Sequence, residues 1–309
     1  MVNDRRAAIV GPDLRYRIHL LTRFPMWQSV LRSWFRGKAA EQVQQSARRR
    51  VIDAGQQPLP PCDVAVVFAL AVESGGLVDL LGDVIDIRGH GFVARCGKLE
   101  GRNVVVGESG PGGEAAARAT AAILRGHRPQ WVVSAGFAGG LDPRLARGDI
   151  LMADHVADLA GDQLAIGFDI PAEEVARTPG LHVGRLLTVD QIIRQPQEKL
   201  SLGETHDALA VDMESMAVAR VCQREKVRFL CVRVISDAQG DRLPAEIDHL
   251  LRQTSRAGRW GAATGVIFRR PSSVKDMLQL KEHALLASDR LAKFLAGTVT
   301  QLVPENDTE

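Results

Sequence analysis

Two carboxylates stand in a stretch of the chain that is otherwise small and apolar. The stretch AVDMESMAVARVC runs from Ala210 to Cys222 and carries Asp212 and Glu214. An ionised carboxylate that is buried without a partner costs several kcal/mol, even after the protein relaxes around it. Either one of these acids therefore faces water, or a group outside the stretch binds it.

Further polar and glycine residues fall where predicted strands end. In open α/β sheets ligands bind beyond the carboxyl ends of the strands. Glycine lets a backbone approach a ligand closely, and the first amides of a helix bind anions. The residues at these ends are Glu73 in FALAVESGG, Ser109 in GESGPGG, Gly136 in WVVSAGFAGGL, and Ser236 with Asp237 in VRVISD.

Each of these features has an ordinary structural explanation when it is taken alone. Glycine-rich turns between strand and helix are common, and neither GPGG nor GFAGG matches the dinucleotide fingerprint or the Walker loop. An aspartate after a strand often caps a helix or forms a turn, and Glu73 alone fits a solvated surface acid. Because all four features fall at the same edge of one predicted sheet, we predict a ligand site there.

The elements that must position these residues alternate between strands and helices. Near-continuous apolar runs predict strands that are covered on both faces. The pattern predicts an α/β fold, a three-layer sandwich around a central mixed, largely parallel β-sheet. The expected strands are 63–70, 102–109, 131–136, 149–156, 184–190 and 228–236, and the expected helices are 113–126, 212–226 and 274–295.

Composition is typical of a globular protein without a membrane span. The chain has 309 residues, of which 45% are hydrophobic and 25% charged. We find no apolar run of about 18 residues and no apolar core of a secretory signal, so a cytoplasmic location is expected. The four cysteines lack CxxC spacing, which favours buried reduced thiols over a zinc site or a disulfide framework.

The first part of the chain differs in charge from the rest. Residues 1–57 hold eleven Lys/Arg and four Asp/Glu, against 28 and 33 in the remainder. We therefore divide the chain into a basic N-terminal extension and linker, 1–61, and a catalytic domain, 62–309. The extension fits a helix packed on the core or on a partner subunit, a basic helix on an anionic membrane, or less well a nucleic-acid patch or a transit peptide.

Read in order, the motifs of the second region resemble those of one protein family. SGPGG, SAGFAGGL followed by GDI, VDMESMAVARVC and FLCVRVISD are similar to the nucleoside phosphorylase and nucleosidase superfamily. The similarity is greatest to its 5′-methylthioadenosine/S-adenosylhomocysteine nucleosidase branch, and it covers roughly Asp63 to Asp237. It implies a homo-oligomer that cleaves the N-glycosidic bond of nucleosides without a metal or organic cofactor.

The resemblance also implies roles for individual residues. Glu214 matches the glutamate that binds the ribose hydroxyls, and Met213 the methionine that packs on the sugar. Asp237, supported by Ser236, matches the acid that protonates N7 of the leaving purine. Glu73 matches the glutamate that orients the attacking water, and Ser109 matches a hydroxyl near the nucleophile. Gly136 lies in the glycine-rich turn, and Ile192 and Ile193 match the lining of the base pocket.

This set of residues suits the reaction. Cleavage of a purine N-glycoside develops positive charge on the ribose and negative charge on the base, so it needs negative groups near the sugar and an acid at the base. As an acid, Asp237 requires a site that excludes water. Asp212 and Glu214 diverge by about 200° in a helix, so we expect Glu214 to face the pocket and Asp212 to serve the helix dipole.

The nucleophile and the exact substrate stay open at this point. Phosphate needs a cationic clamp, for which Arg118 and Arg144 are candidates outside any motif of the phosphorylases. Hydrolysis by a water that Glu73 activates is simpler and is favoured. The long tail after Asp237 is similar to the hopanoid-associated phosphorylase branch, which would act on an adenosyl-lipid. A phosphorylase and a silent nucleoside-binding module are the alternatives.

Overall fold

A central β-sheet with helices on both faces forms the body of the protein. The computed structural model describes residues 50–53, 59–89, 92–168, 170–243 and 271–303. The strands are β1 (Arg50–Asp53), β2 (Val64–Phe68), β3 (Gly82–Gly89), β4 (Phe92–Leu99), β5 (Arg102–Glu108), β6 (Trp131–Gly140), β7 (Ile150–Asp158), β8 (Gln163–Ala165), β9 (Leu181–Thr188), β10 (Ala210–Asp212) and β11 (Arg228–Asp237).

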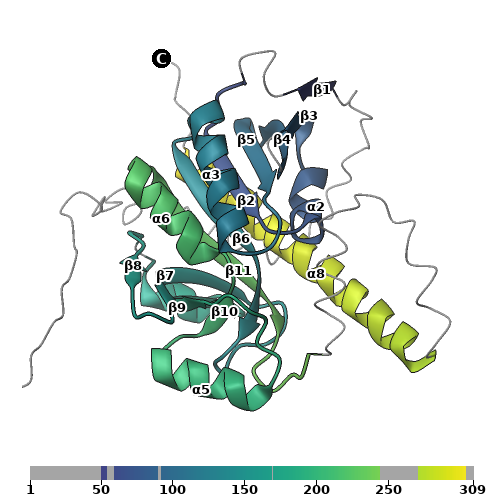
Figure 1. Cartoon of the computed structure of the whole chain (residues 1–309), viewed down its shortest axis with the longest axis vertical. Helices are drawn as coiled ribbons and strands as arrows, with labels where there is room; N and C mark the ends of the chain where they lie inside the picture. Colours follow the sequence, from purple (N-terminus) through teal and green to yellow (C-terminus); the bar gives the residue numbers. More distant parts are fainter. Residues whose placement is uncertain (1–49, 54–58, 90–91, 169, 244–270, 304–309) are drawn as a thin grey trace, which may run out of the picture.

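Two pairs of helices pack on opposite faces of the sheet (Figure 1). Helix α2 packs against α8 on one face, and α3 packs against α6 on the other. Their bounds are α2 (Ala71–Asp79), α3 (Gly113–His127), α4 (Ala172–Arg177), α5 (Pro196–His206), α6 (Ser215–Glu225) and α8 (Pro271–Leu302). The prediction of an α/β fold with covered strands is confirmed.

Strand β2 shows why the covered strands are continuously apolar. Val64, Val66 and Phe68 point into the core that α2 and α8 cover, whereas Ala65 and Val67 point into the core under α3 and α6. All five β2 residues are at most 3% exposed. Each face of the strand thus buries apolar area against a separate pair of helices, and this burial is the main stabilising contribution to the fold.

The sheet is mixed, and one half of it closes on itself. The strand order is β1-β3-β4-β5-β2-β6-β10-β9-β7-β11, and β11 also pairs with β6. The last pairing is parallel and runs from Arg228 opposite Trp131 to Asp237 opposite Gly139. We call the five strands β6, β10, β9, β7 and β11 the strand ring, because each pairs with the next and the last returns to the first. Strands β2 to β5 extend from it as an open sheet.

The boundaries of two expected segments differ in the structure. Asp212 is the last residue of β10 and not the first of a helix, because α6 begins only at Ser215. Arg50–Asp53, which the charge distribution places in the extension, pairs in parallel with β3 at the edge of the sheet. The rest of the basic segment, residues 1–49 and 54–57, and the part of the tail at 244–270 lie outside the described residues.

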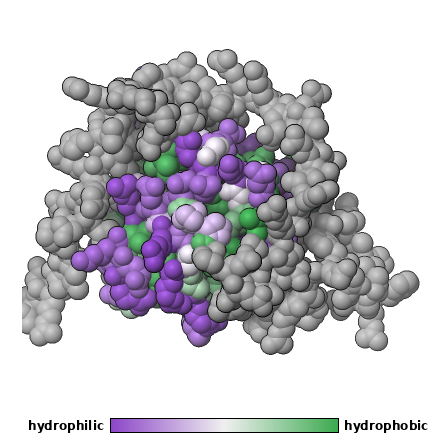
Figure 2. All heavy atoms as spheres, turned by 90° about the horizontal axis from the view of Figure 1, so that it is seen from above, coloured by the Kyte–Doolittle hydropathy of each residue, from purple (hydrophilic) through white to green (hydrophobic). Residues whose placement is uncertain are grey.

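The described part of the protein agrees with the expectation, drawn from composition, of a globular protein without a membrane span. On the face seen in Figure 2 hydrophilic side chains predominate, and apolar ones are interspersed among them. None of the helices in the described ranges combines the length and the apolar character that crossing a membrane requires. The four cysteines are free and buried, as expected, and burial raises the pKa of the Cys96 and Cys222 thiols to about 12.

Candidate active site

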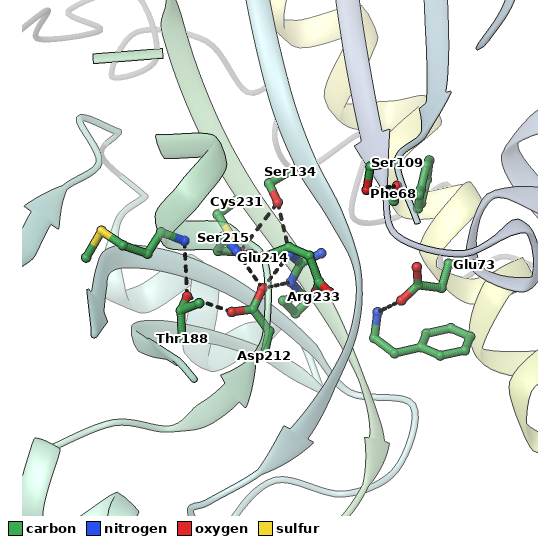
Figure 3. Close-up of polar contacts among 12 residues, drawn as sticks. Phe68, Glu73, Ser109, Ser134, Thr188, Asp212, Glu214, Ser215, Cys231 and Arg233 are labelled. Carbon is green, nitrogen blue, oxygen red and sulfur yellow. Dashed lines mark hydrogen bonds and ion pairs between the residues drawn. The ribbon is translucent and has the colours of Figure 1, made fainter. Parts of the chain in front are cut away.

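A buried ion pair between Arg233 and Asp212 lies at the centre of the site (Figure 3). Arg233 is on β11 and is 3% exposed. Its Nη2 donates to Asp212 Oδ2 over 2.6 Å, and its Nε donates to the same oxygen over 3.1 Å. Burial alone would lower the pKa of Arg233, but the neighbouring acidic groups, Asp212 foremost, together raise it. The guanidinium therefore stays charged.

The same ion pair gathers hydroxyls from three further elements. Arg233 Nη2 also donates to Ser134 Oγ over 2.9 Å and to Ser215 Oγ over 2.7 Å. Asp212 Oδ1 accepts from Thr188 Oγ1 over 2.7 Å, and Asp212 Oδ2 accepts from the backbone N–H of Ser215 over 3.0 Å. Asp212 thus binds the first amide of α6, as the dipole argument expected, but its main partner is a buried arginine that the sequence analysis missed.

We predict that Asp212→Asn destabilises the fold. It removes the negative charge from a buried pair and leaves Arg233 uncompensated, which typically costs about 3–5 kcal/mol. Urea unfolding followed by circular dichroism measures this loss. The matched control is Asp207→Asn, because Asp207 pairs with Arg185 at the surface and its side chain is 94% exposed. Equal unfolding midpoints for the two variants would contradict the central role of the Asp212–Arg233 pair.

Glu214 occupies the N-cap position of α6, and its side chain reaches the glycine-rich loop after β5. Its Oε1 accepts from the backbone N–H of Gly112 over 2.7 Å. Gly112 has φ +93°, which glycine adopts readily and other residues rarely adopt. The Gly112 amide, just before the first turn of α3, therefore donates to a carboxylate of the chain itself.

Glu73 lies in the first turn of α2 and is 5% exposed. Its Oε2 accepts from the N–H of Leu70, and its Oε1 accepts from the N–H of Phe137 on β6, both over 2.8 Å. Gly136 provides the space for this contact. A Cβ at Gly136 would lie 2.8 Å from both Glu73 Oε1 and Arg233 Nη1, closer than real Cβ atoms approach other atoms.

Burial and mutual repulsion make the two glutamates weak acids. The pKa of Glu214 rises to about 8, first because of burial and then because of the Asp212 and Glu73 charges, against the opposing effect of Gly112 and Arg233. The pKa of Glu73 also rises, mainly through burial, although the Phe137 amide and Arg233 counteract it. One arginine therefore faces three carboxylic groups, and the site holds on to protons near neutral pH.

This proton retention predicts how stability depends on pH. Between the ordinary pKa of 4.5 and about 8, folded Glu214 binds a proton that the unfolded chain releases. The free energy of unfolding should therefore fall as pH rises through this window, by up to about 1.4 kcal/mol per pH unit for this one group. The measurement is the difference in unfolding free energy between wild type and Glu214→Gln from pH 5 to 8. Glu204→Gln, at an exposed position of α5, is the control; a constant difference for both variants would refute the shift.

A second ion pair lies at the tip of β11. The register between β11 and β6 shifts between Ile235 and Asp237, so Ser236 forms a β-bulge, a feature that often re-aims side chains beside functional sites. Ser236 Oγ donates to Asp237 Oδ1 over 2.6 Å, and Lys199 Nζ donates to Asp237 Oδ2. Lys199 was missed by the sequence analysis, because nothing in PQEKLSLG separates it from a solvated lysine.

The other predicted residues lie around these two ion pairs. Ser109 is 6% exposed, and its hydroxyl donates to the carbonyl oxygens of Gly110 over 2.7 Å and Phe68 over 3.2 Å. Met213 is partly buried between β10 and α6. Ile192 lines a cavity of about 530 Å³ together with Gln191, Arg194, Gln195, Glu198, Arg242 and Leu243. Ile193 instead packs into a small apolar core with Leu187 and Val211.

The structure brings Glu73, Gly136 and Glu214 together around Arg233 and sets Asp237 and Ser236 apart from them. Gly136 adjoins Glu73, and Gly139 adjoins Asp237 Oδ2, so the two groups are separated by three residues of β6, or about 10 Å along the strand. One end of the site therefore carries acidic groups around a cation, and the other carries the Asp237–Lys199 pair.

Neither arginine that the sequence offered for phosphate faces the site. Arg118 is exposed and pairs with Glu114 one turn earlier in α3. Arg144 is exposed as well and pairs with Asp142, whose pKa it lowers. Among the described residues no cluster of three or more His, Cys, Asp or Glu is arranged to hold a metal ion.

Comparison with known proteins gives one consistent family. The family model described as "Phosphorylase superfamily" matches residues 63–259, more than half of the chain. The 5′-methylthioadenosine/S-adenosylhomocysteine nucleosidase of Tolumonas auensis is 30% identical over 182 residues, which are 52% of this chain and 79% of that protein. The enzyme of the same name from Anoxybacillus flavithermus is 29% identical over 220 residues, 62% of this chain and 93% of that protein.

Solved structures agree in fold. The nucleosidase of the same name from Neisseria meningitidis, in complex with methylthio-immucillin-A, superposes with a TM-score of 0.55 at 22% identity, covering 76% of this chain and 98% of that one. The one from S. pneumoniae, with the transition-state inhibitor MT-ImmA, gives a TM-score of 0.60 at 18% identity, covering 78% of this chain and all of that one.

Proposed function

Because this chain belongs to the phosphorylase superfamily, we propose that it is a nucleosidase that hydrolyses the bond between adenine and ribose in nucleosides of the 5′-methylthioadenosine and S-adenosylhomocysteine type. Its relatives at about 30% identity carry that name. The observation that carries the proposal is the meeting of Glu73 and Glu214 around Arg233, with Asp237 further along the same sheet edge.

The acidic end of the site suits the sugar. Glu214 would accept hydrogen bonds from the ribose hydroxyls. These bonds would replace the one from the Gly112 amide or form beside it. Glu73 would accept a proton from the attacking water as the new bond to C1′ forms. Its raised pKa makes ionised Glu73 a stronger base than an ordinary glutamate. In its ionised form Glu214 would also stabilise the positive charge that develops on the ribose.

The other end suits the purine. When the bond between C1′ and N9 breaks, its electron pair moves into the purine, and N7 accepts a proton. Asp237 would deliver that proton, held in place by Ser236 Oγ at 2.6 Å. Leaving-group protonation by a positioned acid typically contributes about 10²- to 10⁴-fold in rate.

Water is the better-supported nucleophile. Phosphate binding requires a cationic clamp, usually with arginine. Within the described part of the chain, Arg118 and Arg144 pair with acids at the surface, and Arg233 Nε and Nη2 are committed to Asp212. The Asp212 carboxylate beside Arg233 would also repel a dianion. This arrangement favours hydrolysis over phosphorolysis.

Adenine release tests the proposal. We expect the full chain to release adenine from 5′-methylthioadenosine or S-adenosylhomocysteine at the same rate with and without phosphate, measured by chromatography of the free base. Glu73→Gln and Glu214→Gln should each lower kcat/KM by about 10²-fold or more, because each removes a group that acts on the sugar or the water. Glu204→Gln serves as the control.

Other outcomes assign other functions. Release that requires phosphate and yields a sugar phosphate would make the protein a phosphorylase. Binding of nucleosides without release under any condition would make it a nucleoside-binding module. Loss of activity in Asp212→Asn would not distinguish these functions, because this variant also removes the partner of Arg233 and is expected to destabilise the fold.

We also propose that the basic segment 1–57 contacts anionic membranes. The support for this contact is the excess of Lys/Arg over Asp/Glu in this segment together with its Trp27, Trp34 and Phe35, a composition typical of interfacial helices. Such contact would suit a lipid-linked adenosyl substrate. The full chain should sediment with vesicles that contain phosphatidylserine and not with phosphatidylcholine vesicles; recovery in the supernatant with both would rule the contact out. That the protein is a homo-oligomer is a separate proposal, which rests on the resemblance of its motifs to the nucleosidase family. Light scattering measures the oligomer.

A further inference from the structure

Lys199 is a fully buried lysine with all of its hydrogen-bonding capacity directed at the tip of β11. It lies on α5 and is 0% exposed. Its Nζ donates to Asp237 Oδ2, to the carbonyl oxygen of Ala238 over 2.9 Å and to the carbonyl oxygen of Asp241 over 3.1 Å. An ammonium group has three N–H donors, so these three acceptors satisfy it fully.

Asp237 is the carboxylate that compensates this charge. The nearby Asp241 carboxylate is already bound, because its Oδ2 accepts from Arg147 Nε over 2.7 Å and from the N–H of Ala238 over 2.7 Å. Lys199 reaches only the backbone carbonyl of that residue. The cluster thus contains two ion pairs, Lys199 with Asp237 and Arg147 with Asp241, and is neutral as a whole.

This pairing bears on the acid that the leaving purine needs. Both oxygens of Asp237 accept hydrogen bonds, Oδ1 from Ser236 and Oδ2 from Lys199. Both oxygens of Asp237 are thus bound by donors that carry a proton. Of these donors the Lys199 group is an ammonium, which, unlike a guanidinium, can lose a proton.

We propose that Lys199 supplies the proton that Asp237 passes to the purine, so that the acid of this enzyme is the Lys199–Asp237 pair. The inference rests on the proposed nucleosidase function and names a further residue for it. As the bond between C1′ and N9 breaks, a proton moves from Lys199 Nζ to Asp237, and Asp237 passes a proton to N7.

The step balances in atoms and charge. The bond between Nζ and one hydrogen breaks, and the electron pair stays on nitrogen, which becomes a neutral amine. Asp237 ends as a carboxylate, as it began, and adenine leaves as the neutral N7-protonated base. Water adds to C1′ and gives its proton to Glu73. That proton returns through solvent to Lys199 after the products leave.

The test compares two leaving groups. Adenine needs protonation to depart, whereas the 4-nitrophenolate of 4-nitrophenyl β-D-ribofuranoside does not. Lys199→Met should lower kcat for adenine release from 5′-methylthioadenosine by about 10²-fold or more and leave release of nitrophenolate nearly unchanged. Lys226→Met, at an exposed lysine after α6, is the matched control. Equal losses on both substrates, or no loss on adenine, would overturn the proposal.

Two further variants separate proton supply from positioning and from misfolding. Lys199→Arg keeps a cation beside Asp237 but does not release a proton, so adenine release should stay slow; full rescue by arginine would mean that Lys199 only positions Asp237. The charge-free double variant Lys199→Met/Asp237→Asn buries no unpaired ion. It should release adenine no more slowly than Asp237→Asn alone, because residues that act as a unit are not additive.

These outcomes differ from a failure of the proposed function. If wild-type protein releases no adenine from any nucleoside, the nucleosidase proposal falls. If wild type is active and the double variant is much slower than Asp237→Asn, Lys199 acts independently of Asp237, and only the inference about the pair falls.

Discussion

The ion pair between Arg233 and Asp212 is the interaction on which the site depends. It joins β11 to the end of β10, and through Thr188, Ser134 and Ser215 it reaches β9, β6 and the start of α6. A buried ion pair of this kind often contributes little net stability relative to apolar side chains. Its contribution here is electrostatic, because a single buried cation lies near three carboxylic groups, those of Asp212, Glu214 and Glu73.

The sequence predicted those parts of the fold that local pattern determines. Strands covered on both faces are continuously apolar, so β2, β5, β6, β7, β9 and β11 were all expected near their observed positions. β3 and β4 were missed because charged residues interrupt them. Asp86 and Arg95 face each other across these two strands, and their side chains form an ion pair at 3.2 Å. From the sequence alone, a charged strand residue whose partner lies on the neighbouring strand cannot be distinguished from a charged residue in a loop.

For the candidate site, the sequence predicted the positions of those residues that stand next to the end of a recognisable strand or the start of a helix. Glu214, Asp237 and Glu73 stand at strand ends or helix starts, and the structure places each of them there. Their partners come from elsewhere in the chain. Arg233 lies 21 positions from Asp212, and Lys199 lies 38 positions from Asp237. Such contacts depend on which strands become neighbours, and that follows from the packing of the whole chain and not from the pattern of either segment.

The closed strand ring has a consequence for how the protein loses its function. Arg233 and Asp237 lie on β11, and Gly136 and Phe137 on β6, the two strands whose long parallel pairing closes the ring. Proteins open locally first where few buried contacts hold a segment, and ring strands are the opposite case. Fraying of termini or loops would leave these groups in register. These four residues should therefore keep their relative positions until the protein unfolds globally. Glu73, Glu214 and Lys199 instead belong to α2, the N-cap of α6 and α5, so their positions depend on how these helices dock on the sheet.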